Sequence, residues 1–142
     1  MNQVHRKVVR AAAVSAIGCC LWFVGTACAD EIKVTLKGDN EVPPVMTKAS
    51  GGGTIVVKDD KTVSGSVATT GLDGTMAHIH LGASGTNGPV IVPLNREGVD
   101  KWVVPTGAKL SDDQYRAYKA GELYVNVHTA EHKGGEIRGQ LK

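Results

Sequence analysis

Beyond residue 28 the chain contains no cysteine, because its three cysteines are Cys19, Cys20 and Cys28. A domain formed by the later residues therefore has no disulfide to stabilise it and no thiolate to bind a metal ion. Aromatic residues make up only 4% of the chain, which argues against aromatic platforms on which bases or sugars could stack.

The first 29 residues have the pattern of a secretory signal peptide. Residues 11–24 are almost wholly apolar or small, and a small-residue cleavage site follows at Ala27-Cys28-Ala29. The basic start that such a peptide requires is formed by Arg6, Lys7 and Arg10. The apolar run is too short for a transmembrane helix, so we expect no membrane span and a protein that is periplasmic or secreted.

We expect one mature domain over residues 30–142, which is enough chain for a single core. A lipoprotein signal with Cys28 as the lipidated residue is the alternative, although Gly25 stands where such a signal normally has leucine. Without the three basic residues of the signal, 13 Lys and Arg remain against 14 Asp and Glu. This balance gives no basic surplus for binding nucleic acid.

Short alternations of apolar and polar residues, separated by glycine-rich turns, run through the mature chain. They predict strands at 31–36, 54–58, 62–70, 76–82, 90–94, 122–128 and 136–141, with one more around Trp102. One helix is expected after Ser111, because Gln114 completes a capping box and Gly121 can end the helix. This pattern predicts an all-β fold: an antiparallel Greek-key β-sandwich or barrel of about seven or eight strands with one short helix.

All four histidines of the mature chain lie in two of these stretches, at positions His78, His80, His128 and His132. Side chains alternate along a strand, so His78 and His80 share one face while Ile79 takes the other. His128 points away from Val127 in the same manner. If the two strands are neighbours, the imidazoles can meet on the side away from the core.

A cluster of neutral imidazoles suits copper, zinc, iron or nickel. Copper is the working hypothesis, because the cluster has no thiolate or carboxylate and the affinity order favours Cu²⁺; zinc is the competitor. The simplest alternative is that the four histidines are unrelated surface residues. Arg138 alternates with Ile137 and so points out of the core, either as a plain edge charge or as a guide for an anion beside the metal.

The segment His128-Thr129-Ala130-Glu131-His132 also matches a zinc-protease motif. That motif needs a helix to bring both histidines to one side. A β-rich sequence precedes it and Gly134-Gly135 follows directly, which leaves no room for a helix. We therefore expect His128 to end a strand and His132 to return from a loop.

Several ordered motifs run through the mature chain: Asn40-Glu41-Val42-Pro43-Pro44-Val45, Ala77-His78-Ile79-His80 with Gly88-Pro89-Val90, Tyr124-Val125-Asn126-Val127-His128-Thr129, and Gly134-Gly135-Glu136-Ile137-Arg138-Gly139-Gln140. Together they resemble the CHRD domain, which is named after chordin. The resemblance runs from about residue 31 to 141. Bacterial members of that family are exported single-domain proteins, which is the organisation expected here.

A looser resemblance is to copper-zinc superoxide dismutase, a Greek-key β-barrel. That family has two copper-binding histidines on one strand, which match His78 and His80. A further histidine on a later strand matches His128. The zinc ligands and the disulfide of that family have no equivalent here, so the resemblance implies a copper-only site. It further implies His132 as the remaining ligand and Arg138 as the residue that attracts superoxide.

Three functions follow from these patterns. The first is a copper-dependent superoxide dismutase, with a metal ion and the superoxide anion as partners. The second is a copper or zinc carrier or buffer without turnover, which would use the same ligands in a closed site. The third is an extracellular interaction module in which the histidines are incidental. The oligomeric state is left open, a homodimer included.

Overall fold

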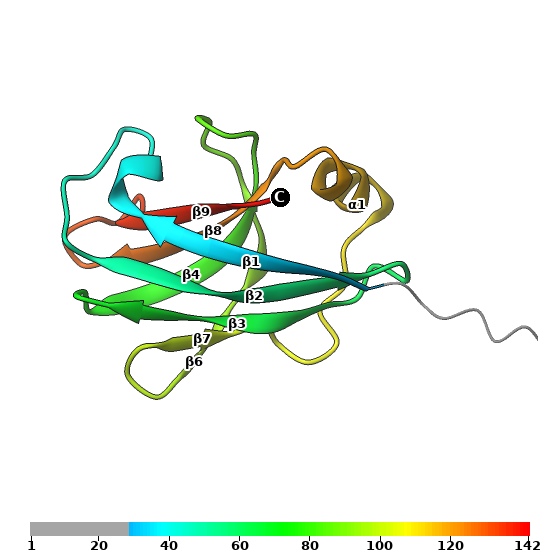
Figure 1. Ribbon diagram of the computed structural model, residues 1–142, viewed down its shortest axis with the longest axis horizontal. Helices are drawn as coiled ribbons and strands as arrows, with labels where there is room; N and C mark the ends of the chain where they lie inside the picture. Colours follow the sequence, from blue (N-terminus) through cyan, green and yellow to red (C-terminus); the bar gives the residue numbers. More distant parts are fainter. Residues whose placement is uncertain (1–28) are drawn as a thin grey trace, which may run out of the picture.

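The computed structural model describes residues 29–142 (Figure 1). The predicted signal peptide, apart from Ala29, and the lipidation candidate Cys28 lie outside the described residues. Within the described part of the chain, no helix has both the length and the apolar character needed to cross a membrane.

Residues 29–142 form one antiparallel sheet of nine strands in the order β5-β4-β8-β9-β1-β2-β3-β7-β6. The strands are β1 (Ala29–Lys37), β2 (Ser50–Lys58), β3 (Val63–Thr70), β4 (Gly74–Leu81), β5 (Val90–Pro93), β6 (Asn95–Glu97), β7 (Lys101–Val103), β8 (Leu123–Thr129) and β9 (Ile137–Leu141). The predicted all-β antiparallel fold is confirmed. The strand number exceeds the expected seven or eight because the stretch around Trp102 forms a complete hairpin, β6 with β7.

The sheet rolls into a nearly closed barrel. Its two edge strands, β5 and β6, are separated in sequence by one residue, Leu94, so the two edges must lie close together. The Leu94 amide donates to the carbonyl of Ala77 in β4 at 2.9 Å, which fixes this crossing. A closed sheet leaves fewer unpaired backbone groups at its edges.

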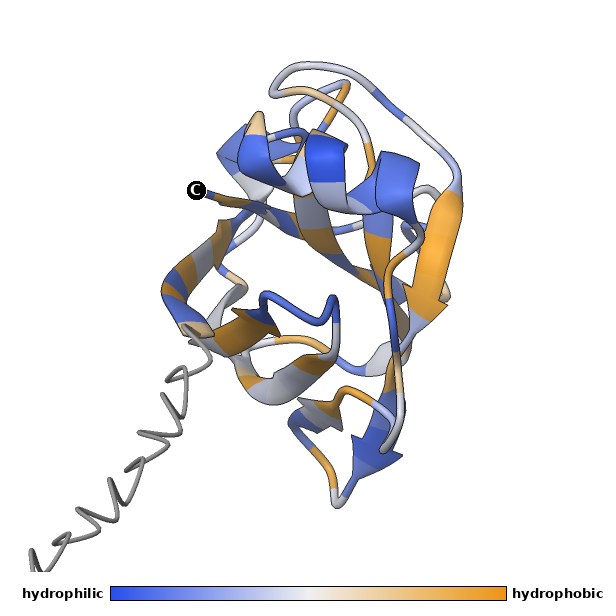
Figure 2. Ribbon diagram, turned by 90° about the vertical axis from the view of Figure 1, so that its right-hand side faces the viewer, coloured by the Kyte–Doolittle hydropathy of each residue, from blue (hydrophilic) through white to orange (hydrophobic). Residues whose placement is uncertain are grey.

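The barrel interior is filled by the apolar side chains that the alternation predicted. In β1, for example, Ile32, Val34 and Leu36 are buried while the residues between them are exposed. Figure 2 shows the resulting alternation of hydrophilic and hydrophobic bands along the strands. The core also takes up Trp102.

The expected helix is present as α1 (Asp112–Lys119), which lies near one end of the barrel (Figure 1). The capping box of Ser111 and Gln114 is formed in both directions. Gly121 follows the helix with a φ of +73°, a conformation that glycine adopts without strain. Tyr118 is the helix residue that is buried against the core.

Two loops cover the outer face of the barrel beside β8 and β9. One runs from η1 (Gly38–Asn40) to β2, and the other joins β4 to β5. The Asn40 amide donates to the Arg138 carbonyl at 3.0 Å, and Asn87 links the two loops by donating to the Val42 carbonyl at 2.9 Å. As a result, all seven residues of β8 are buried, on both faces of the strand.

Candidate functional site

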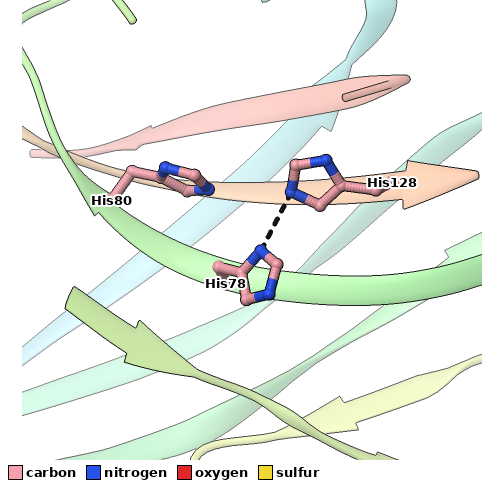
Figure 3. Close-up of side chains that lie close together, drawn as sticks. All are labelled: His78, His80 and His128. Carbon is pink, nitrogen blue, oxygen red and sulfur yellow. Dashed lines mark hydrogen bonds between the residues drawn. The ribbon is translucent and has the colours of Figure 1, made fainter. Parts of the chain in front are cut away.

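Three of the four predicted histidines meet on the covered outer face (Figure 3). His78 and His80 come from β4 and His128 from the neighbouring strand β8. Nδ1 of His78 lies 3.0 Å from Nε2 of His128, and one nitrogen from each ring lies within 4.8 Å of the others. The geometry therefore confirms that the two strands are neighbours and bring imidazoles together outside the core.

The backbone fixes which nitrogen of two rings carries the proton. Nδ1 of His80 lies 2.9 Å from the Gly88 carbonyl, and Nδ1 of His128 lies 3.0 Å from the Lys133 carbonyl. A carbonyl oxygen only accepts, so both Nδ1 atoms are donors and both Nε2 atoms keep a lone pair. Since His128 Nε2 is an acceptor, Nδ1 of His78 is the donor in the bond between these two rings.

Nε2 of His80 is buried and finds no hydrogen-bond partner among residues 29–142. A buried acceptor without a partner is unfavourable, and in native proteins it calls for an explanation such as an ion. Two nitrogens that share an ion at about 2.0–2.1 Å are at most about 4.2 Å apart, so binding would draw these rings slightly closer together. The donor set therefore fits a metal ion with small ring movements.

All three rings are held neutral at pH 7. Burial lowers the pKa of His78 to about 4, with the neighbouring His128 and His80 adding to the shift. Burial also lowers the pKa of His80 and His128, and the positive charge of Arg138 adds to both shifts. Neutral imidazole is the form that binds a metal ion.

Two glycines allow the backbone to pack closely around this site, Gly88 beside His80 and Gly135 beside Asn126. A Cβ at Gly88 would lie 1.6 Å from the Leu81 carbonyl, so another residue there would displace the carbonyl that holds His80. Gly135 has a φ of +128°, and a Cβ there would lie 2.3 Å from Oδ1 of Asn126. Both glycines belong to the motifs noted in the sequence, but their role depends on contacts that no local pattern reveals.

Tyr124 supports His80 from the side. The two rings stack with centroids 4.9 Å apart and an angle of 6° between their planes. The Tyr124 hydroxyl accepts from the Gly88 amide at 3.1 Å, and Gly88 in turn accepts from His80. Tyr124, to which the sequence analysis assigned no role, therefore helps to hold this histidine in place.

Arg138 is buried, with 3% of its side chain exposed, so the interpretation as a plain edge charge is wrong. Its guanidinium pairs with Glu41 at 3.0 Å and donates to the Thr86 carbonyl at 2.8 Å and to Asn87 Oδ1 at 2.5 Å. It also lies 4.1 Å from the centroid of the Tyr124 ring. Arg138 thus clamps both covering loops to β9, and its role as an anion guide stays a prediction.

Glu41 is the second member of this buried ion pair. Burial raises the pKa of its carboxyl group, and the charge of Arg138 offsets only part of that rise. Oε1 of Glu41 has no hydrogen-bond partner within residues 29–142. Sequence alternation could not identify this contact, because residues 41 and 138 lie on elements far apart in the chain.

His132 lies outside the group of converging nitrogens. Its backbone amide donates to Thr129 Oγ1 at 3.1 Å, and its carbonyl accepts from the Thr129 amide, so the residue sits in the turn after β8. The residue lies in a turn and not in a helix, as expected, but this turn does not bring its ring to the other three histidines. Among residues 29–142, no carboxylate joins His78, His80 and His128 within the same cluster.

No curated protein and no solved structure matches this chain. The family model of the CHRD domain matches residues 32–141, which is nearly all of the described domain and includes the three clustered histidines, Glu41 and Arg138. The chain belongs to the CHRD domain family.

Proposed function

We propose that this protein binds copper through His78, His80 and His128, and that the centre dismutates superoxide. The observation that carries the proposal is the buried Nε2 of His80, whose lone pair has no partner within residues 29–142 and lies beside two further imidazoles. Histidines without thiolate or carboxylate favour copper over the hard cations, and the affinity order places copper above zinc. Zinc is the competitor to test.

Three protein ligands leave a coordination position for a small substrate, as in catalytic metal sites. Bound copper would supply one-electron redox chemistry. One superoxide ion loses an electron and becomes dioxygen, and a second gains an electron and two protons and becomes hydrogen peroxide. The charge of Arg138, which acts on both His80 and His128, would favour an anion near the centre.

His78 must expose a lone pair to join the other two ligands. Its Nδ1 proton now lies in the bond to His128. Moving that proton to Nε2 keeps the ring neutral and turns Nδ1 into an acceptor. His78 is the most accessible of the three rings, so this exchange with water is feasible at the rim of the site.

The test is metal analysis of the purified protein followed by titration with Cu²⁺ and Zn²⁺ and a superoxide assay. We expect one copper per chain, activity that a chelator removes and copper restores, and no activity with zinc. His80→Ala and His128→Ala should lose tight copper binding, whereas the control His132→Ala should keep it. Equal copper binding by His80→Ala and the wild type would overturn the proposal.

A carrier or buffer is the second candidate, and the enclosure of Arg138 favours it. The Arg138 guanidinium is paired with Glu41 and only 3% exposed, so it attracts an incoming anion more weakly than an unpaired, exposed guanidinium would. Stoichiometric copper binding without superoxide consumption would select this function.

The proposed export can be tested by the mass of the mature protein: a chain that starts at Asp30 supports a cleaved signal, and a lipid on Cys28 supports the lipoprotein.

A further inference from the structure

Met76 stands beside the three histidines on the same strand face. It precedes His78 by two residues in β4, and alternate residues of a strand point to the same side. The strand register places Met76 directly opposite His128, in the same way that His78 faces Asn126 and His80 faces Tyr124. Directly opposite residues of an antiparallel pair have Cβ atoms about 4.5–5.5 Å apart, so the two side chains are neighbours.

The order along β4 places Met76 and His80 on opposite sides of His78. Figure 3 shows the His80 and His128 rings entering from opposite sides, with His78 hydrogen-bonded to His128. Because Met76 pairs with His128 in the strand register, it lies on the His128 side of His78. A register shift lies immediately before it, between Gly74 and Met76, and such bulges change the direction of side chains.

The Met76 side chain is not used for core packing. Met76 is 50% exposed, although Ala77 and Ile79 on the same strand are buried in the core. Methionine has three rotatable side-chain bonds and a polarizable thioether, so a half-exposed methionine can turn toward an ion without disturbing the core. Thioether sulfur is a soft donor that selects Cu(I).

We propose that the Met76 thioether is a fourth ligand of this centre and makes it selective for Cu(I). The inference rests on the proposed copper site and adds the oxidation state that the site holds most tightly. Because a fourth protein ligand fills the position that superoxide would take, it favours the carrier over the dismutase. Three imidazoles and one thioether supply four donors to a cuprous ion. The same thioether adds little for Zn²⁺, which prefers nitrogen, thiolate and carboxylate ligands.

The test compares Met76→Leu with wild-type protein in a competition assay against a Cu(I) chelator and in a Zn²⁺ titration. We expect Met76→Leu to weaken Cu(I) binding by about tenfold or more, because it removes the soft donor, and to leave Zn²⁺ binding unchanged. Met46→Leu is the matched control, since Met46 is fully exposed on the loop before β2 and should affect neither metal. X-ray absorption at the copper edge should find a sulfur neighbour in the wild type and in Met46→Leu, and none in Met76→Leu.

The outcomes separate the two proposals. Copper binding that depends on His80 and His128 but is the same in Met76→Leu and the wild type, with no sulfur neighbour, overturns the role of Met76 and leaves the three-histidine site standing. A wild-type protein that binds no copper overturns both. Unfolding curves of the leucine variants verify that the fold is intact, which is expected for substitutions at exposed side chains.

Discussion

The two faces of β8 are both buried, but they are buried in different ways. The inner face presents Leu123, Val125 and Val127 to the barrel core. The outer face presents Tyr124, Asn126 and His128 to a layer of polar side chains under two loops. Apolar packing is non-directional, whereas each buried polar atom needs a partner in a defined direction.

This difference shows in the buried atoms without partners. Within residues 29–142 these are Nε2 of His80, Oε1 of Glu41, Oδ1 of Asn126 and Nε1 of Trp102, and the first three belong to the outer layer. A buried layer whose polar atoms lack some hydrogen-bond partners is less stable than a fully paired layer, and such layers are common where a ligand binds. The incompletely paired polar groups, and with them the candidate site, therefore lie on the outer face.

The largest expected effect comes from breaking the ion pair of the outer layer. Arg138→Met leaves Glu41 buried without its partner, which should lower the free energy of unfolding by about 3–5 kcal/mol. Urea unfolding of protein prepared without metal measures the loss. The double variant Glu41→Gln/Arg138→Met removes both charges and should regain most of it; a double variant no more stable than the single one would contradict this account.

Truncation of the inner face should reduce stability without affecting the metal site. Ile79 lies between His78 and His80 in sequence, yet its side chain is 1% exposed in the core. Ile79→Ala should cost about 2–5 kcal/mol in unfolding free energy and leave the copper affinity of the folded protein unchanged. A titration under strongly native conditions measures that affinity, and a large loss would mean that the two faces are not independent.

Acid should destabilise the protein through the outer layer. In the unfolded chain a histidine has a pKa of about 6.5, while burial lowers the pKa of folded His78 to about 4. Between these values the unfolded state binds more protons, so stability is fully present above about pH 6.5 and decreases as the pH falls toward 4. Melting temperatures of wild type and His78→Ala over this range test the prediction: the variant should show the weaker pH dependence.

The smallest effect is expected from Tyr124→Phe, which keeps the ring and removes one hydroxyl. The Gly88 amide loses its acceptor, at a cost of about 1–3 kcal/mol or less if water reaches it. The Gly88 carbonyl orients His80, so copper affinity should fall about tenfold, as when a group that orients a ligand is removed. Equilibrium titration measures the affinity; unchanged binding would show that the stacked ring alone positions His80.

The sequence by itself determined the inner face and the local elements. Alternation of apolar residues identified the strands and assigned Ile79 and Val127 to the core, because a period of two reports which side of a sheet a residue takes. The capping box identified the helix at Ser111, because that signal is contained within four residues. The same alternation placed His78 and His80 on one face, which was sufficient to suggest a metal site.

Only the tertiary structure decided what covers the outer face. Alternation says that Arg138 points away from the core, but its burial depends on Glu41 and Asn87, which are 97 and 51 residues away in sequence. The convergence of His78 and His128, and the exclusion of His132, depend equally on strand pairing and on the path of a turn. A sequence period reports the direction of a side chain relative to its own strand, whereas contacts between distant segments depend on how loops and strands pack together.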